Sequence, residues 1–296
     1  MKIVLITGGT GLIGSYFIKH FLNEYNFILI TRNKKNILYK HTNITVIDWS
    51  DFKKDNHDIL DRVDIVINLA GESIMKRLSK KNKTKIYNSR ISCTQTLVKA
   101  INQSKNPPEC LINASAIGYY KTQNFPLDEK CSAGDDFMSS VCQHWEEEAK
   151  KACIRTTQIR IGLVLDPNGG FLKTLLLPFK LFGGGHLGNG NQGCPWVHRD
   201  DVIFSIKYII ESKLIEGPVN IVAPEIHSLK SFCFNLGKQL RRPSWFHVPA
   251  WIIRLIFGEL APSFLNTPFI KPEKLEKNGY EFKYKKLKTA LRELLA

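Results

Sequence analysis

Apolar residues follow two alternating patterns along the first half of the chain. Unbroken aliphatic runs predict strands buried on both faces of a sheet; they cover residues 3–7, 27–31, 44–47, 63–69, 110–114 and 157–161. Between them, apolar residues at helical spacing predict helices over 12–22, 86–101 and 138–152. Strands that alternate with helices in this way imply right-handed crossovers. The pattern therefore predicts an α/β fold with a doubly wound, Rossmann-type parallel sheet.

A glycine-rich turn joins the first strand to the first helix. It fits both the G-x-x-G-x-x-G and the G-x-G-x-x-G spacing, which are weak signals alone but strong between a buried strand and an amphipathic helix. Such a turn brings backbone N–H groups and a helix N-terminus to a pyrophosphate. The expected phosphate-binding residues are Gly8, Gly9, Thr10, Gly11, Leu12, Ile13 and Gly14.

The end of the second strand indicates which dinucleotide binds. A site for NAD usually has an acidic residue there, which accepts a hydrogen bond from the ribose 2′-hydroxyl. This chain has Thr31-Arg32-Asn33-Lys34-Lys35 instead. Because a cluster of cations suits a 2′-phosphate, we expect the cofactor to be NADP(H).

The pattern changes after residue 162. A helix is predicted over 202–211 and a strand over 218–222, and a mostly helical tail starts at residue 227. We expect an NADP-binding Rossmann domain over 1–162, to which the strand near 218–222 returns. The remaining residues, 163–296, would form a smaller substrate-side region.

The stretch 183–193 holds six glycines in eleven residues. We expect so many glycines to sustain neither a helix nor a strand. One interpretation is a mobile lid that closes over the nicotinamide and positions His198. The other is a linker that crosses the surface between the two regions.

Bulk composition narrows the function further. The net charge is +15, but the lysines are dispersed and not interleaved with stacking aromatics, so specific nucleic-acid binding is not expected. The seven cysteines contain no C-x-x-C pair and no close His ligands, so we expect reduced thiols and no metal. No apolar run reaches the ~18 residues of a membrane span. We therefore expect a protein of the cytoplasm or an organelle matrix, with no membrane partner.

Several motifs together resemble a known family. They are the glycine turn, Asn68-Leu69-Ala70-Gly71-Glu72, Ser115-Ala116-Ile117-Gly118-Tyr119-Tyr120, Arg160-Ile161-Gly162-Leu163-Val164-Leu165, Trp196-Val197-His198-Arg199-Asp200-Asp201 and Asn220-Ile221-Val222-Ala223-Pro224. The chain resembles the epimerase family of atypical short-chain dehydrogenase/reductases, the YfcH-like proteins. The part from about 245 to 296 is similar to that family's C-terminal domain of unknown function.

The resemblance implies an NADP site made from particular residues. Thr31 and Arg32 should meet the adenosine phosphate, and the backbone of Leu69, Ala70 and Gly71 should pass the cofactor. The other residues that the resemblance places near the cofactor are Arg90, Ser115 and Val164.

The chain departs from ordinary short-chain dehydrogenases at the catalytic pair Tyr-x-x-x-Lys, in which Tyr is the proton donor. Counting back from Glu146, the Tyr position holds Met138 and the Lys position holds Cys142. Ala116 occupies the usual place of the family's serine, and Ser115 precedes it. The candidates for a substitute proton donor or base are Tyr119, Tyr120 and His198, although each could equally be a packing residue.

These features predict an NADP(H)-dependent oxidoreductase, or a protein like the nucleotide-sugar epimerases, that acts on a small molecule of unknown identity. The alternative is a catalytically idle NADP-binding sensor or partner-binding protein. The missing Tyr/Lys pair favours the alternative, whereas the retained substrate-side region favours the enzyme. The oligomeric state is left open.

Overall fold

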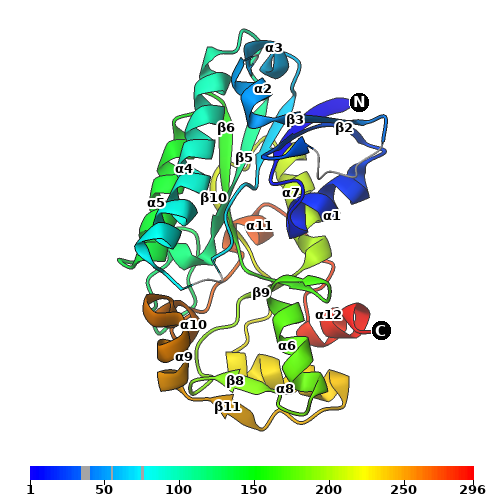
Figure 1. Cartoon of the computed structure of the whole chain (residues 1–296). Helices are drawn as coiled ribbons and strands as arrows, with labels where there is room; N and C mark the ends of the chain where they lie inside the picture. Colours follow the sequence, from blue (N-terminus) through cyan, green and yellow to red (C-terminus); the bar gives the residue numbers. More distant parts are fainter. Residues whose placement is uncertain (35–40, 55, 75–76) are drawn as a thin grey trace.

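The computed structural model describes residues 1–34, 41–54, 56–74 and 77–296. Its centre is a seven-stranded parallel sheet in the order β10-β6-β5-β4-β1-β2-β3 (Figure 1). The strands are β1 (Lys2–Thr7), β2 (Tyr25–Thr31), β3 (Ile44–Asp48), β4 (Ile65–Asn68), β5 (Cys110–Ala116), β6 (Arg155–Ile161) and β10 (Gly217–Ile221). The predicted Rossmann-type sheet is confirmed, and the late strand β10 lies beside β6.

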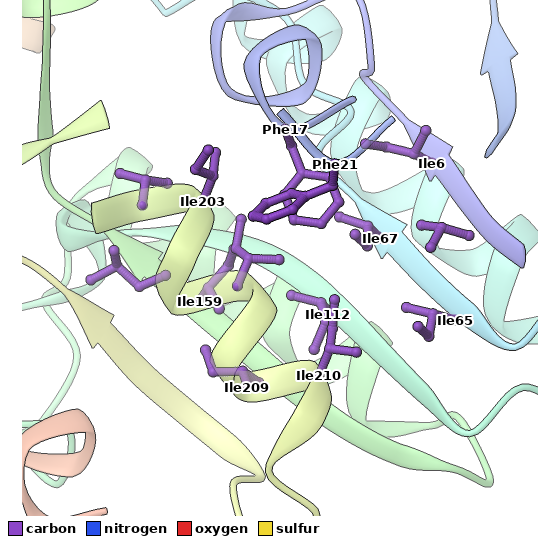
Figure 2. Close-up of a cluster of buried hydrophobic side chains, with 14 of the residues drawn as sticks. Ile6, Phe17, Phe21, Ile65, Ile67, Ile112, Ile159, Ile203, Ile209 and Ile210 are labelled. Carbon is purple, nitrogen blue, oxygen red and sulfur yellow. The ribbon is translucent and has the colours of Figure 1, made fainter. Parts of the chain in front are cut away.

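One face of the sheet is covered by α1 (Leu12–Phe21) and α7 (Arg199–Glu211). Figure 2 shows Phe17 and Phe21 of α1 meeting isoleucines of the strands and of α7. These are all buried side chains: Ile6, Ile65, Ile67, Ile112, Ile159, Ile203, Ile209 and Ile210. Because strands of a parallel sheet are buried on both faces, their apolar runs need this cover.

The other face is covered by α4 (Lys80–Gln103) and α5 (Phe137–Lys150), together with the short helices α2 (Trp49–Lys54) and α3 (Asn56–Leu60). Leu97, Val98 and Ile101 of α4 are buried against Val66 and Leu111 of the sheet. α4 begins at residue 80, six residues before the predicted helix, because Ser79 caps its N-terminus by accepting a hydrogen bond from the backbone N–H of Asn82.

The C-terminal region packs around a second core. Its helices are α6 (Gly170–Lys180), α8 (Leu229–Leu240), α9 (Ala250–Phe257), α10 (Ala261–Leu265), α11 (Glu273–Lys277) and α12 (Leu287–Leu294). Two small parallel pairs complete it: β7 (Leu163–Asp166) with β9 (Trp196–His198), and β8 (Gly185–Leu187) with β11 (Phe246–Val248). Figure 1 shows α6, α8, β8 and β11 together at one end of the molecule.

The expectation that the glycine-rich stretch 183–193 sustains no strand is wrong. β8 lies within it and pairs with β11. A Cβ added at Gly185 would lie 1.4 Å from the carbonyl oxygen of Phe246, so only glycine allows the two backbones to meet. Here the glycines serve close backbone packing.

The segment 280–284, which precedes the last helix α12, packs against a buried carboxylate. Asp201, which is fully buried at the start of α7, accepts hydrogen bonds from the backbone N–H groups of Lys283 (2.7 Å) and Tyr284 (2.9 Å). The hydroxyl of Tyr280 also reaches its backbone carbonyl, at 3.2 Å. These contacts hold residues 280–284 against α7, one of the helices that cover the sheet. Among the described residues, no helix is long and apolar enough to cross a membrane.

We predict that Asp201→Ala destabilises the fold by about 3 kcal/mol, because it leaves two backbone N–H groups without their acceptor, at least one of them buried. The free energy of unfolding, measured by urea denaturation, checks this. Asp135→Ala is the matched control, since the Asp135 side chain is 88% exposed and should change stability by less than about 0.5 kcal/mol. Equal stability of the two variants would contradict the docking role of Asp201.

Candidate functional site

A hollow of about 420 Å³ lies at the carboxyl edge of the sheet, beside the ends of β1, β2 and β4. In folds of this kind ligands bind at that edge. Eight of the residues expected to bind the cofactor line it: Gly8, Thr10, Gly11, Thr31, Arg32, Leu69, Ala70 and Gly71. The hollow is thus formed by the segments that the glycine turn and the resemblance indicated.

The glycine turn forms one wall of the hollow. Gly8 has φ +70°, and a Cβ there would lie 2.5 Å from the carbonyl oxygen of Leu69, so the turn touches the end of β4. Gly14 packs in the same way against Gly8. α1 begins after Gly11, which provides no side-chain cap, and its first turn holds no acidic residue. Its first N–H groups are therefore suited to an anion.

The other residues of the turn support it from behind. Gly9 faces Leu29 beneath the turn, where a Cβ would lie 2.4 Å from a leucine methyl. Leu12 packs against the backbone at Gly169, and Ile13 packs on the core beneath α1. Val164 lies on β7 and also packs on this core. None of these four residues lines the hollow.

Two residues that sequence reasoning missed lie at the Thr31–Arg32 end of the hollow. Trp49 and Lys53 of α2 line the hollow together with Thr31 and Arg32. β3 runs parallel to β2 with Asp48 opposite Thr31, so the residue after β3 emerges beside the end of β2. That register could have indicated Trp49. Lys35, part of the expected cation cluster, lies outside the described residues.

Arg32 is the expected partner of a 2′-phosphate. Its side chain is 83% exposed, and its Nη1 lies 3.4 Å from Oε2 of Glu72. So long a contact from an exposed arginine contributes little stability. Lys34, by contrast, is paired with Asp51. The arrangement leaves Arg32 and Lys53 as cations at the open side of the hollow.

The cation near the Lys position of the missing pair comes from a different helix. Arg90 of α4 is half-buried, donates from Nη2 to the Glu72 carbonyl at 3.1 Å, and lies 5.2 Å from the centre of the Trp145 ring. It is also an electrostatic neighbour of Cys142. Burial raises the pKa of the Cys142 thiol to about 12, so the thiol is protonated at neutral pH.

A buried polar network lies beneath the end of β5. Arg160 of β6 forms a two-pronged ion pair with Glu146 of α5, with both N–O distances 2.8 Å, and Ser115 donates to the same carboxylate at 2.7 Å. The Arg160 guanidinium also lies 3.5 Å from the centre of the Tyr119 ring. The expected cofactor residue Ser115 is therefore 4% exposed and occupied with Glu146.

The two candidate tyrosines differ in their surroundings. Tyr120 is buried; its hydroxyl donates to Asn220 at 2.6 Å and accepts from Arg160 at 2.9 Å. Burial raises its pKa. Tyr119, at the end of the 3-10 turn Ile117–Tyr119, is half-buried, and its hydroxyl has no hydrogen-bond partner among the described residues. Tyr119 therefore has the more available hydroxyl.

His198 lies away from the hollow, between β9 and the C-terminal helix. Its Nδ1 accepts from the backbone N–H of Asp200 at 3.1 Å, its Nε2 lies 2.8 Å from Glu293, and its ring stacks on Tyr284. The side chain is fully buried. Both nitrogens are engaged in holding α7 and α12 together.

The chain has the strand order, the glycine turn and the hollow at the carboxyl edge that are typical of dinucleotide-binding Rossmann proteins. A profile of the NAD dependent epimerase/dehydratase family matches residues 4–154, and one of a domain of unknown function, DUF1731, matches residues 248–294. Epimerase family proteins of Staphylococcus epidermidis and Staphylococcus saprophyticus are each 36% identical over the whole chain, covering 99% and 100% of those proteins. The chain belongs to this epimerase family.

Solved structures agree with this assignment. The human epimerase family protein SDR39U1, solved with NADPH, superposes with a TM-score of 0.90 at 28% identity, over 99% of this chain and 98% of that one. A nucleoside-diphosphate sugar epimerase of Corynebacterium glutamicum superposes with a TM-score of 0.76 at 27% identity, over 99% of this chain and 58% of that one. The likeness extends over both regions of the chain.

We predict that His198 makes the fold less stable in mild acid. Burial lowers its pKa below the ordinary 6.5, so the unfolded chain takes up a proton first as the pH falls. The free energy of unfolding should therefore decrease from about pH 7 to about pH 5, and less so in His198→Gln. Burial raises the pKa of Asp201, so this residue makes the fold more stable as the pH falls. Because Asp201 is present in both proteins, the difference between their pH profiles reports the contribution of His198. Parallel pH profiles would refute this role.

Proposed function

We propose that the protein is an NADP(H)-dependent oxidoreductase or epimerase that acts on a small molecule. The observation that carries this proposal is the hollow at the carboxyl edge, which joins the glycine turn, the end of β4 and the cations Arg32 and Lys53. The turn leaves room for a ligand at Gly11, where an added Cβ would have only the Gly8 carbonyl oxygen within 4 Å. NADPH in the human relative supports the same choice.

Each end of the hollow would hold a different part of the cofactor. The N–H groups at the start of α1 would bind the pyrophosphate, Trp49 would stack on the adenine, and Arg32 and Lys53 would bind the 2′-phosphate. The carboxylate of Glu72 lies next to Arg32 and would repel the 2′-phosphate. Lys53 would supply a second positive charge that offsets this repulsion. A bound nicotinamide would supply hydride transfer.

The proton would be held by Tyr119. The Arg160 guanidinium against its ring favours the negative charge that develops on the phenol oxygen as the proton leaves. Glu146 fixes that guanidinium with two hydrogen bonds. In this arrangement Arg160 takes over the charge role of the missing lysine, while Tyr119 replaces the tyrosine absent from position 138. The substrate would be a carbonyl or hydroxyl compound; the Corynebacterium relative supports a sugar nucleotide.

Cofactor preference is the first test. We expect NADPH to bind more tightly than NADH by about tenfold or more, ~1.4 kcal/mol, in a calorimetric titration. Arg32→Ala and Lys53→Ala should each remove much of the preference, because they delete a partner of the 2′-phosphate while leaving NADH binding nearly unchanged. Lys54→Ala is the matched control, since Lys54 is adjacent but does not line the hollow. Equal affinities for the two cofactors would contradict the assignment.

Turnover is the second test. The protein is incubated with NADP⁺ and one of three sugar nucleotides: UDP-glucose, UDP-glucuronic acid or UDP-N-acetylglucosamine. The absorbance of the reduced nicotinamide reports oxidation, and analysis of the product sugars reports epimerisation. With a substrate so found, Tyr119→Phe should lower kcat by about a hundredfold or more, since it removes the group that takes up the hydroxyl proton on oxidation and returns it on reduction. It should leave NADPH binding intact. Tyr120→Phe tests the other tyrosine and should act mainly on stability.

Two outcomes would count against this mechanism. If Tyr119→Phe keeps full activity, the proton is held elsewhere. If the protein binds NADPH but neither these sugars nor a wider panel of carbonyl compounds is converted, the catalytically idle alternative, which Met138 and Cys142 already favour, becomes the better description.

A further inference from the structure

Two long segments of the C-terminal region contain no carboxylate. Neither 167–199 nor 226–258 has an Asp or Glu, although each carries several cations. Their Lys and Arg residues are Lys173, Lys180, Arg199, Lys230, Lys238, Arg241, Arg242 and Arg254. The first segment holds α6 and β8, and the second holds α8, β11 and α9. Because β8 pairs with β11, the two segments lie together at one end of the molecule (Figure 1).

The same segments expose an unusual amount of apolar side chain. Of the thirteen large apolar residues that are exposed among the described ones, ten belong to these two segments. Leu177, Leu181 and Phe182 at the end of α6 are 56% to 70% exposed. Trp245, before β11, is 77% exposed, and its Nε1 donates to the Phe182 carbonyl at 2.9 Å. The end of α6 and the start of β11 thus form one continuous patch.

α9, which follows β11 in the chain, carries a second exposed apolar surface. It begins two residues after β11 ends, and its Trp251 and Leu255 are 64% and 69% exposed. These two residues are four apart, so they share a face of the helix, and the exposed Arg254 lies on that face between them. Only Ile253 of α9 is fully buried. A helix with this exposure would be costly in water if nothing covered it.

Cations are interleaved with the apolar residues. Lys173, Leu177 and Lys180 of α6 are all exposed and follow one another at helical spacing, and the exposed Leu181 comes directly after the helix. The Arg242 guanidinium lies 4.6 Å from the centre of the Phe182 ring. Tryptophans and aliphatic residues mixed with Lys and Arg are typical of helices that lie in the headgroup layer of a bilayer.

The chemistry favours a lipid surface over other occupants. Leucine and isoleucine side chains gain little from nucleic-acid bases, which bind to aromatic platforms, but they partition into hydrocarbon. Two segments without any carboxylate match the negative potential of anionic headgroups. We propose that the exposed face of α6, β11 and α9 docks on an anionic lipid bilayer, as a peripheral contact that leaves the cofactor hollow outside the membrane.

Vesicle flotation tests this proposal on the full chain. Vesicles of phosphatidylcholine and phosphatidylglycerol in equal amounts should carry the protein, and vesicles of phosphatidylcholine alone should not. Added salt should weaken binding, because the charge contribution is screened. The double variant Trp251→Ser/Leu255→Ser should bind at least about tenfold more weakly, since it removes two exposed apolar side chains that would enter the bilayer. Lys180→Glu should weaken binding by roughly fivefold or more.

Matched variants elsewhere control for general effects of exposure and charge. Leu214→Ser removes an apolar side chain that is 85% exposed near β10, and Lys213→Glu reverses an exposed charge beside it. Both should float like the parent protein. All four variants should keep parental NADPH affinity, which shows that they are folded.

Any of four results would overturn the proposal. The first is that the parent protein does not float with the anionic vesicles, and the second is that the surface variants float as well as the two controls. The third is that the protein forms dimers that the surface variants abolish and that vesicles do not dissociate, in which case the face binds a second copy of the chain. The fourth is tight binding of single-stranded DNA that the same variants lose, which would assign the face to nucleic acid.

Discussion

The close approach of the β1–α1 turn to the end of β4 determines the geometry of the whole nucleotide-binding half. At Gly8 the backbone has a positive φ and lies so near Leu69 that a Cβ would stand 2.5 Å from its carbonyl oxygen. Because the turn can come this close, α1 leaves the sheet edge at once and runs back over β1 and β2. Its buried phenylalanines then meet α7, which closes that face of the sheet. The same approach aims the uncapped start of α1 at the hollow.

The second constraint is electrostatic. Arg160 and Glu146 are both buried, and an ion pair removed from water persists only when its remaining hydrogen-bonding groups are satisfied. Ser115, Tyr120 and the Glu129 carbonyl provide those partners. The network joins β5, β6 and α5, the helix that holds Met138 and Cys142. A chain that lost that pair therefore still has a fixed positive charge under an available phenol.

Local patterns in the sequence predicted the sheet and the phosphate turn because both depend on neighbouring residues. The aliphatic runs up to residue 161 predicted six of the seven strands of the sheet, and the late strand 218–222 was expected to join them. Trp49 and Lys53 were missed because their place depends on the register of β3 against β2. β8 was missed because its glycines are explained by Phe246, some sixty residues later. His198 could not be judged from its own motif, since its partner Glu293 lies 95 residues away.

A crystal structure of the protein in complex with NADPH is the most direct test of the proposed cofactor site. We expect electron density for the dinucleotide in the hollow of about 420 Å³, with the pyrophosphate at the start of α1 and the 2′-phosphate between Arg32 and Lys53. We also expect the nicotinamide on the side of Tyr119, with the Tyr119 hydroxyl facing the space next to the nicotinamide ring. Density for the nicotinamide remote from Tyr119, or a saturating concentration of NADPH that leaves the hollow without density, would contradict it.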